Sequence, residues 1–345
     1  MVMKMLSERT ERILKIIIDE YVWHALPIGS EAILQKYDLG VSPATIRNEV
    51  ARLEKEGYVL RRHISGGGVP SDKGYRYYIE YLVHRMDVPV DEQRMISHLF
   101  HQVESELEEW TRLTASLLAR MVQSLALVTF PKAVSSRFGR VELVSLQESL
   151  ATLVLLMQEA RLRQQLISFD REVSQEDLLA AARELNDLLK GLTWSQILAY
   201  KGEFTALAGE VKRIVVDIMV EEDAANYEEP YIEGLRNMIT QPEFAASKDM
   251  IGIVDVIENK GTLRALLPGS VPWDGVQVVI GGENREDALK GCSMVMTLYG
   301  IPGEVKGALG IIGPTRMPYE RAISAVNYLS SIMSNLVSEI YTGRQ

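Results

Sequence analysis

The stretch SPATIRNEVARLEK at residues 42–55 decides how the N-terminal part of the chain folds. Ser42 and the proline that follows it form a strong helix start, because serine caps free backbone N–H groups and proline suits the first helical position. With about 3.6 residues per turn, Ile46, Val50 and Leu53 fall on one face of that helix. The pattern predicts an amphipathic helix that packs into a small core through this apolar face.

The opposite face of the predicted helix carries side chains that are suited to reading DNA. Four residues point away from the apolar face and two flank them: Ala44, Asn48, Arg52 and Lys55, with Thr45 and Arg47 at the sides. Arginine pairs bidentately with guanine, asparagine pairs with adenine, and the methyl group of alanine or threonine can contact the methyl group of thymine. The helix therefore fits a recognition helix. The solvated face of an ordinary amphipathic helix is the alternative.

The flanking segments complete a small domain. A helix is expected to begin after Ser7 and a second one at Ser30, and both precede the 42–55 helix. After Gly57 the chain reads as a hairpin of two short strands around the glycines at 66–68. Three helices and a hairpin in this order predict a winged helix-turn-helix.

Basic residues near the hairpin are the expected phosphate contacts. We assign Arg61, Arg62 and Lys73 to phosphates. The residues assigned to base edges are Thr45, Arg47, Asn48 and Arg52. The full set of predicted DNA-contacting residues is Ser42, Ala44, Thr45, Arg47, Asn48, Arg52, Lys55, Arg61, Arg62, His63 and Lys73.

The composition is that of a soluble globular protein. Of the 345 residues, 47% are hydrophobic and 24% are charged, which excludes an intrinsically disordered chain. The longest nearly apolar stretch, residues 150–157, is far shorter than the ~20 residues of a membrane-spanning helix. The N-terminus lacks the apolar segment of a secretory signal, and the single cysteine, Cys292, excludes an intrachain disulfide. We expect a cytoplasmic protein without a cofactor or membrane association.

Charge is distributed unevenly along the chain. The net charge is -10, but residues 1–85 carry 13 Lys and Arg against 11 Asp and Glu. The remaining residues carry 24 basic and 36 acidic side chains. Such an asymmetry is a domain signal, so a mildly basic N-terminal domain is expected to precede an acidic body.

Beyond the first domain, helical and strand-like patterns alternate. A single long helix is expected over 91–128, and three strands are expected at 141–146, 152–157 and 162–169. Downstream come helical segments, three more strands and a last helix, at 174–200, 250–267, 276–280, 293–299, 307–312 and 318–341. Two sets of three strands around a helical interlude predict one sheet that is interrupted by an insertion.

Motifs along the whole chain resemble those of one family. The N-terminal blocks are GVSPATIRNE at 40–49, Leu53-Glu54, Gly57-Tyr58 and PSDKGYRYY at 70–78. The blocks in the body are Leu185-Asn186, Gly191, YIEG at 231–234, QPEF at 241–244, Ile280-Gly281, Glu283-Asn284, IGPTRM at 312–317 and Tyr319. In this order they resemble the HrcA family of heat-inducible transcription repressors.

The resemblance implies an α+β protein of several domains. Residues 1–88 would form the winged-helix DNA-binding domain, 89–171 and 271–345 a GAF-like α/β domain with an antiparallel sheet, and 172–270 an inserted α/β dimerising domain. It also implies a homodimer that binds a CIRCE-type inverted repeat in double-stranded DNA upstream of chaperone operons. The GroE chaperonin would maintain its active state. Family members commonly carry an arginine in the wing where this chain has Gly68, and Arg61, Arg62 and His63 are the alternative source of that charge.

Other functions are weighed against this one. A metabolite-sensing repressor would use the GAF-like domain as a ligand pocket. An enzyme would need a nucleophile–base pair or a metal cluster, and neither stands out in the sequence. The glycines at 66–68 lack the Lys-Ser/Thr of a phosphate-binding loop, and His98 and His101 have the spacing of a metal-binding pair without a clear third ligand. The preferred interpretation is a negative regulator of heat-shock genes and not an enzyme.

Overall fold

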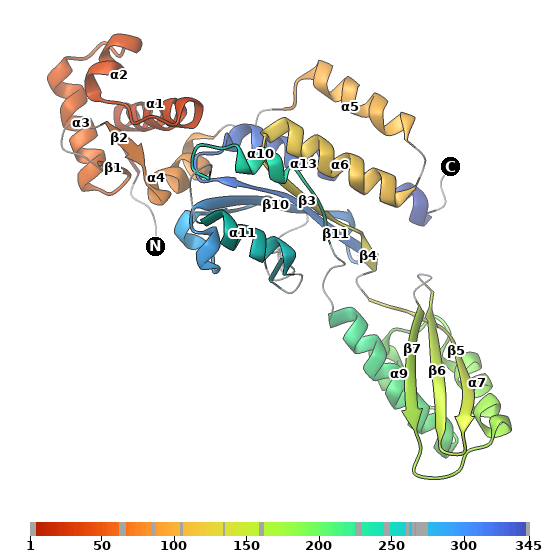
Figure 1. Cartoon of the computed structure of the whole chain (residues 1–345). Coiled ribbons are helices and arrows are strands. Elements are labelled where there is room, and N and C mark those ends of the chain that lie inside the picture. The colour runs from red at the N-terminus through yellow and green to blue at the C-terminus, as the bar shows by residue number, and fades with distance from the viewer. Residues whose placement is uncertain are drawn as a thin grey trace. The chain divides into compact units, whose positions relative to one another are not determined.

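The computed structural model describes residues 5–61, 67–83, 87–103, 106–133, 135–158, 162–224, 230–244, 249–259, 262–263, 266 and 275–342. The chain divides into two compact units (Figure 1). Unit 1 comprises Met1–Pro131, Glu229–Ile301 and Gly307–Gln345, and unit 2 comprises Lys132–Glu228 and Pro302–Lys306. Unit 2 is therefore an insertion in the sequence of unit 1.

Unit 1 begins with three helices and a hairpin. These elements are α1 (Glu8–His24), α2 (Ser30–Lys36), α3 (Pro43–Lys55), β1 (Val59–Arg61) and β2 (Gly68–Pro70) (Figure 1). Ser7 and Ser42 cap α1 and α3, and each side chain accepts a hydrogen bond from the backbone N–H three residues later. The two strands pair antiparallel. The predicted order of these elements is confirmed.

The described residues from 5 to 83, called the head below, have a core to which each helix contributes one face. Ile13 and Leu14 of α1, Ile33 of α2, and Ile46 and Leu53 of α3 have no exposed surface. Burying each of these side chains contributes about 1.5–3 kcal/mol relative to leaving it exposed. The apolar spacing that predicted the inner face of α3 is confirmed.

A short helix leads out of the head and is followed by two longer ones. The elements are α4 (Asp72–Tyr77), a π-helical turn (Tyr78–Leu82), α5 (Val90–Gln102), α6 (Leu107–Val122) and strand β3 (Leu125–Thr129). The prediction of one helix over 91–128 is wrong. Val103 is extended after α5, and the apolar run at 125–129 pairs as a strand. Periodicity alone does not separate a short buried strand from a helix.

An antiparallel sheet forms the centre of unit 1. Its strand order is β8-β3-β11-β10-β9, and β4 pairs with the start of β11. The further bounds are β4 (Lys132–Ala133), β8 (Pro230–Glu233), β9 (Gln277–Ile280), β10 (Cys292–Ile301) and β11 (Val305–Pro314). In the register, Leu127 of β3 lies opposite Gly310 of β11 and Ile232 of β8. The expectation of an antiparallel sheet in the body is confirmed.

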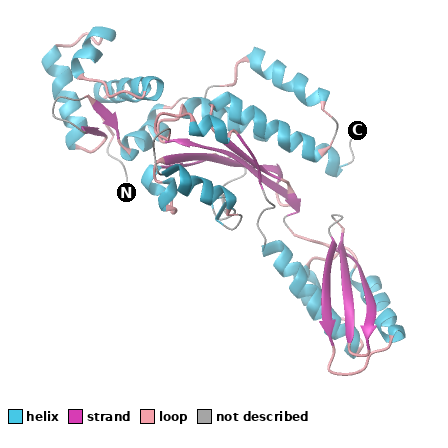
Figure 2. Ribbon diagram, in the orientation of Figure 1, coloured by secondary structure: helices cyan, strands magenta, loops and turns pink. Residues whose placement is uncertain are grey.

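Helices cover both faces of this sheet. α6 and α13 (Tyr319–Thr342) lie over one face, and α11 (Asp249–Glu258) lies on the other (Figures 1 and 2). β10 and β11 are consequently buried along almost their whole length. At the start of α13, the hydroxyls of Tyr319 and Ser293 are 2.7 Å apart and joined by a buried hydrogen bond.

Unit 2 consists of a three-stranded antiparallel sheet and three helices. The elements are β5 (Phe138–Gln147), β6 (Leu150–Met157), β7 (Leu162–Ser168), α7 (Gln175–Leu189), α8 (Trp194–Ala199) and α9 (Ala206–Ala224) (Figure 2). Val141, Leu153 and Leu155 of the sheet pack in one core with Leu185 of α7 and Val215 of α9. The alternation along β6 turns every second side chain of that strand towards this core.

The expected division of the chain needs correction. The strands at 138–168 pair with one another and not with β9–β11, so the prediction of one shared sheet is wrong. Unit 2 comprises 132–228 and the short segment 302–306, rather than 172–270, and residues 229–301 and 307–345 belong to unit 1. The alternating strands could not reveal this, because hydrophobic alternation marks the face that a strand buries but not the strand with which it pairs.

Candidate nucleic-acid interface

α3 turns one face to the head core and the other outward. Ile46, Val50 and Leu53 have exposed fractions of 0%, 4% and 0%. Of the predicted contact residues on this helix, four are exposed and two are half-buried: Ala44, Arg47, Asn48 and Lys55, and Thr45 and Arg52. The structure therefore brings the predicted base-reading side chains together on the outer side of one helix.

Ser42 fixes the start of this helix. Its side-chain oxygen accepts a hydrogen bond from the Thr45 backbone N–H at 3.2 Å, and the two hydroxyls are 2.9 Å apart. Replacing such a cap typically costs about 1 kcal/mol of stability. Both side chains are at the exposed N-terminal end of α3, where the backbone N–H groups favour an anion such as phosphate.

Three of the predicted arginines are paired with carboxylates of the head. The pairs are Arg47–Glu31, Arg52–Glu56 and Arg61–Glu54, with closest N–O distances of 3.1, 3.0 and 2.6 Å. The hydrogen bond to Glu56 raises the pKa of Arg52, so this guanidinium is charged at any physiological pH. All six side chains keep between 24% and 78% of their surface exposed. A polyanion can therefore reach these pairs.

The other predicted cations and the asparagine differ in their contacts. The side chains of Asn48 and Lys55 are exposed and make no hydrogen bond or ion pair with another residue that the structure describes. Lys73 donates to the Glu56 carbonyl oxygen at 2.7 Å, and its ammonium is 4.2 Å from the centre of the Tyr58 ring. These contacts hold Lys73 beside the C-terminal end of α3. Arg62 and His63 lie outside the described residues.

Gly68 does not offer a side-chain position on the wing. It is buried in β2 opposite Arg61, and its N–H donates to the Ile28 carbonyl oxygen at 3.0 Å. A Cβ atom at this position would lie 2.4 Å from Cγ1 of Val59. The interpretation of Gly68 as a lost basic contact of the wing is therefore wrong, because the strand has no room for an arginine there.

Glu49 is a polar core residue that sequence reasoning missed. Its carboxylate accepts hydrogen bonds from the Arg9 guanidinium at 2.8 and 3.0 Å and from the Thr10 hydroxyl at 2.8 Å. Burial acts to raise the pKa of Glu49, but the hydrogen bonds from Thr10 and Arg9 together outweigh it and lower the pKa. Glu49 thus ties the inner side of α3 to α1. The sequence feature that indicates its burial is its position next to Val50, at the border of the apolar face of α3.

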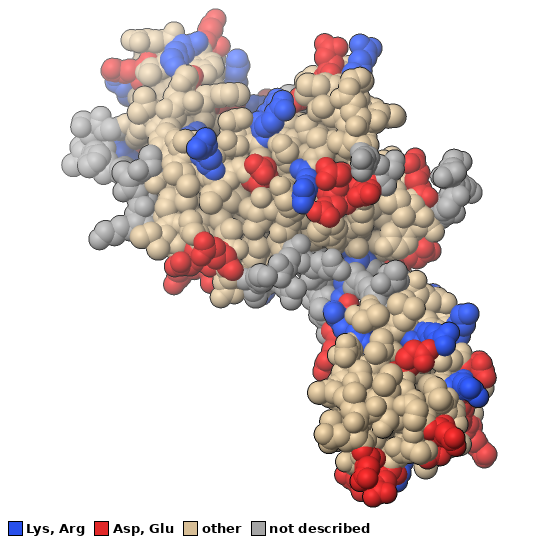
Figure 3. Space-filling model, turned by 45° about the vertical axis from the view of Figure 1, so that its right-hand side comes forward, with Lys and Arg blue, Asp and Glu red and all other residues tan. Residues whose placement is uncertain are grey.

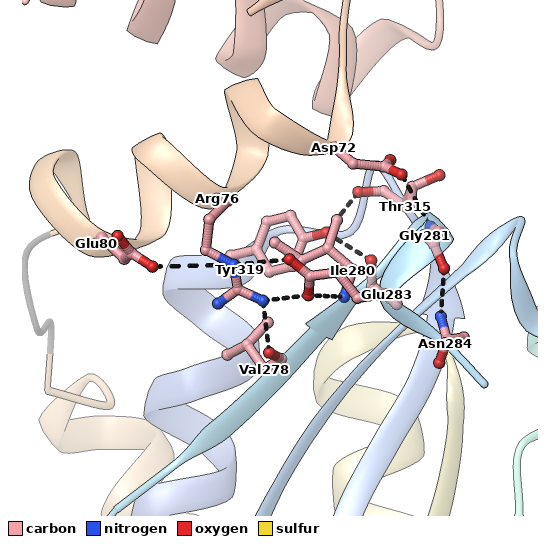
Figure 4. A network of polar contacts seen from close by, with 12 residues as sticks. Asp72, Arg76, Glu80, Val278, Ile280, Gly281, Glu283, Asn284, Thr315 and Tyr319 are labelled. Atoms are coloured by element: carbon pink, nitrogen blue, oxygen red, sulfur yellow. Dashed lines mark hydrogen bonds and ion pairs between the residues drawn. The ribbon is translucent and has the colours of Figure 1, made fainter. Parts of the chain in front are cut away.

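A second polar network joins the head to the rest of unit 1 and is called the joint below. Arg76 of α4 donates to both carboxylate oxygens of Glu283 and, at 2.8 Å, to the Val278 carbonyl oxygen (Figure 4). The Asp72 carboxylate accepts the Gly282 N–H at 2.8 Å. The short α4 helix is therefore held from both ends by the turn that follows β9.

Two further residues, Arg316 and Tyr78, extend the joint. Arg316 donates to the Val22 carbonyl oxygen at 2.9 Å, which links the segment before α13 to α1. Tyr78 donates to the carboxylates of Asp19 and Glu320, at 3.1 and 3.2 Å. Burial and these carboxylates raise the pKa of Tyr78 well above its ordinary value, so its hydroxyl remains a donor.

The joint brings together sequence blocks that lie far apart along the chain. PSDKGYRYY at 70–78 supplies Asp72 and Arg76, and Glu283 and Arg316 come from two blocks of the body. Their pairing could not be derived from any local pattern, because about 200 residues separate the partners along the chain. Sequence reasoning therefore identified the blocks but not their common location.

The histidine pair and the cysteine singled out by the sequence belong to no group of potential metal ligands in the described part of the chain. Within the described ranges, no three His, Cys, Asp or Glu side chains are grouped so that they could hold a metal ion. His101 has its Nδ1 atom 2.7 Å from the Ser97 carbonyl oxygen, and Cys292 is buried at the start of β10. None of the helices that the structure describes is long and apolar enough to cross a membrane.

Charged side chains of both signs occur together on the surface of the molecule. Lys and Arg side chains are interspersed with Asp and Glu over the face shown in Figure 3. Interspersed charges of both signs give a weaker field than a continuous basic patch.

Comparisons with known proteins agree over nearly the whole chain. The family model "HrcA protein C terminal domain" matches residues 108–323. The heat-inducible transcription repressor HrcA of Dehalococcoides mccartyi is 44% identical over 337 residues, covering 98% of this chain and 97% of that protein. The repressor of the same name from Roseiflexus castenholzii is 38% identical over 344 residues, covering 97% and 96%.

A solved structure shares the fold. The crystal structure of a hypothetical protein, determined at 2.2 Å resolution, superposes with a TM-score of 0.58 at 22% identity and covers 97% of this chain and 98% of that one. The sequence relationships define the class of the chain, which is that of the transcription repressors. Within that class, the chain belongs to the HrcA family.

Proposed function

We propose that the chain is a negative regulator of heat-shock operons and binds a CIRCE-type inverted repeat through a winged helix-turn-helix. The observation that carries this proposal is the outer face of α3, where Arg47, Asn48 and Lys55 are exposed opposite a fully packed inner face. Membership of a family of heat-inducible transcription repressors supports the same function. The protein would act in the cytoplasm, where operator DNA is found.

The contacts divide into two classes by their place in the head. Arg47, Asn48 and Arg52 on α3 would reach base edges in the major groove, where a good bidentate contact contributes about 1–3 kcal/mol of discrimination. Arg61 on β1 and Lys73 beyond the hairpin would contact phosphates, which give affinity without sequence preference. This division is the one that a winged helix-turn-helix requires.

Self-association is the second part of the proposal, because an inverted repeat matches the two-fold symmetry of a homodimer. The face of the unit 2 sheet turned away from the core carries exposed apolar side chains beside the Arg140–Glu142 ion pair: Val144, Leu156, Leu162 and Leu166 are 49%, 41%, 58% and 61% exposed. An antiparallel sheet with one solvated face normally carries polar side chains there. Exposed apolar patches of this kind mark interaction sites.

These exposed side chains support a dimer interface in a different segment of the chain from the one expected. The family resemblance alone placed dimerisation in 172–270, whereas the exposed apolar side chains belong to the strands between 138 and 168. Leu155 and Leu156 give a matched pair for a test, since they are neighbours on β6 with exposed fractions of 0% and 41%. Leu156→Glu should yield a folded monomer by light scattering, and Leu155→Glu should unfold unit 2. A stable Leu156→Glu dimer would contradict this interface.

Regulation by the GroE chaperonin is the third part. Strand β3 pairs with β8 and β11, so the central sheet closes only after unit 2 and much of the body have been synthesised. Sheets built from such distant segments fold slowly and expose apolar surface on the way. Heat would lower the concentration of folded dimer, and free chaperonin would raise it again by assisting refolding.

The function is tested by transcription in vitro from a chaperone promoter that carries an inverted repeat. Added protein should lower the RNA yield from this template and leave a template with a scrambled repeat unaffected. Chaperonin and ATP should raise the fraction of diluted protein that is competent to repress. Equal RNA yields from both templates at every protein concentration would contradict the proposed function.

A further inference from the structure

The carboxylates that pair with the DNA-facing arginines come from three different places in the head. Glu31 lies on α2, Glu54 on α3 and Glu56 directly after α3. Each is the ion-pair partner of one predicted contact residue: Arg47, Arg61 and Arg52, in that order. Every described arginine that we assign to a DNA contact therefore forms an ion pair with a carboxylate in this structure.

All three pairs are accessible to solvent, since the carboxylates of Glu54, Glu56 and Glu31 are 24%, 27% and 78% exposed. In the Arg47–Glu31 pair, the side chains are 60% and 78% exposed. Exposed pairs contribute about 0–1 kcal/mol to folding, because water and salt screen them. Glu49 stands in contrast, since it is buried against three donor atoms. A contribution other than folding must be sought for Glu31, Glu54 and Glu56.

We propose that Glu31, Glu54 and Glu56 limit non-specific DNA binding by competing with phosphates for Arg47, Arg61 and Arg52. This inference rests on the proposed DNA-binding function. Non-specific affinity arises from cations that neutralise phosphates and release counterions. An arginine that already has a carboxylate partner gains little by exchanging it for a phosphate. On an operator the exchange also places the guanidinium on guanine, whose two directed hydrogen bonds give a base discrimination that a phosphate contact on random DNA does not give.

The three carboxylates should differ in effect, because their partners have different assignments. Glu31 and Glu56 hold the base-reading residues Arg47 and Arg52, so they should favour operator over random sequence. Glu54 holds Arg61, which is assigned to phosphate, so it should weaken binding to all DNA equally. The head then combines a low net charge with selectivity, instead of relying on a basic patch that binds DNA of any sequence.

The experiment measures affinity for two DNA duplexes, an inverted repeat from upstream of a chaperone gene and its scrambled version, over a salt series. The variants are Glu31→Gln, Glu56→Gln and Glu54→Gln. Glu108→Gln is the matched control, because Glu108 forms an exposed ion pair with Arg112 on α6, outside the head. Thermal unfolding of each variant should match the wild type.

The expected results separate the two roles. Glu31→Gln and Glu56→Gln should tighten binding to scrambled DNA several-fold more than binding to the inverted repeat, so that the specificity ratio falls. Glu54→Gln should tighten binding to both duplexes by the same several-fold factor and steepen the salt slope by about one. Glu108→Gln should change neither affinity.

Two outcomes would overturn the inference, and they are distinguishable. Unchanged affinity for scrambled DNA and unchanged salt slopes in all three variants would show that the carboxylates do not compete with phosphate, while leaving the proposed function intact. A wild-type protein that binds both duplexes equally at every salt concentration would overturn the proposed function, and the selectivity inferred here with it.

Discussion

The joint and the outer face of α3 are both built from arginine–carboxylate contacts, but they differ in burial and in the number of partners. At the joint, Arg76 is 21% exposed and contacts Glu283, Glu80 and the Val278 carbonyl oxygen. On α3, Arg47 is 60% exposed and pairs with Glu31. A side chain with several partners is fixed, whereas an exposed pair exchanges partners easily. The arginine that connects the head to the rest of unit 1 is thus fixed, whereas the arginine on the face proposed to contact DNA can change partners.

The largest expected effect compares two glutamates that contact different sides of α3. Glu49→Ala should destabilise the protein by about 2–3 kcal/mol, because Thr10 loses a buried acceptor and Arg9 loses a charged one. Glu31→Ala should cost less than about 0.5 kcal/mol, because its ion pair with Arg47 is exposed. Urea unfolding followed by circular dichroism measures both values. Equal losses would show that the two sides of α3 do not differ as described.

The next effect concerns DNA and not stability. Asn48→Ala should weaken binding to the inverted repeat by about 2 kcal/mol and leave the urea midpoint unchanged, because Asn48 lies on the outer face. Lys55→Ala is the matched variant on the same face. It should weaken binding to every sequence and reduce the salt slope by about one, as expected for a phosphate contact. If both variants bind the inverted repeat as tightly as the wild type, α3 does not enter the groove.

A double-mutant cycle tests the joint itself. Arg76→Gln and Glu283→Gln, alone and together, should give a coupling free energy of about 1 kcal/mol, since the pair is partly buried and shares further hydrogen bonds. The same cycle on Arg47 and Glu31 should give a value near zero. Hydrogen exchange of α4 should rise in the Arg76→Gln protein. Equal coupling free energies in the two cycles would contradict the proposed difference between the fixed Arg76–Glu283 pair and the exchangeable Arg47–Glu31 pair.

The smallest effect is a pH dependence of stability that has opposite signs for two carboxyl groups. Asp19 lies on α1, and Glu49 contacts α1. Burial raises the pKa of Asp19, with the hydrogen bond from Tyr78 acting against it. The folded state therefore holds this proton more tightly, so the contribution of Asp19 to stability is present below the ordinary pKa of 3.8 and is lost as pH rises through the folded value. Asp19→Asn should consequently stabilise the protein at neutral pH.

Glu49 should respond in the opposite direction. Its folded pKa is lowered, so its contribution is present above the ordinary pKa of 4.5 and is lost as pH falls through the folded value. Glu49→Gln should destabilise the protein at neutral pH and flatten the loss of stability in acid. Urea unfolding of both variants across the acid range is the measurement. A shift of the same sign in both would contradict the assigned pKa directions.

Much of the head could be predicted from the sequence, because local rules determine it. Serine caps at Ser7 and Ser42 and the apolar spacing of Ile46, Val50 and Leu53 are properties of neighbouring residues, and the structure has each of them in the predicted place. The outer face of α3 follows from the same geometry. The element order and the candidate contact residues of α3 were therefore accessible without coordinates.

The features that were missed depend on distant partners. Nothing near Arg76 indicates that Glu283 will lie beside it, and nothing in residues 141–169 distinguishes a separate sheet from half of a larger one. The sequence pattern predicts the end of a helix where strand β3 lies, because the fully buried apolar run of this strand shows no alternation. The family resemblance suggests a basic contact at the position of Gly68, whereas the burial of this residue depends on Val59 and Ile28. Sequence patterns determine faces and caps, but not pairing.

The most direct test of the account is the affinity of the wild-type protein for an inverted repeat from upstream of a chaperone gene, measured by fluorescence anisotropy at physiological salt. A scrambled duplex of the same composition is the reference, and the Asn48→Ala protein is the control for the surface involved. Binding to the inverted repeat should be at least about a thousand-fold tighter than to the scrambled duplex, and Asn48→Ala should reduce that preference about 30-fold. Equal affinity for the two duplexes would contradict the account.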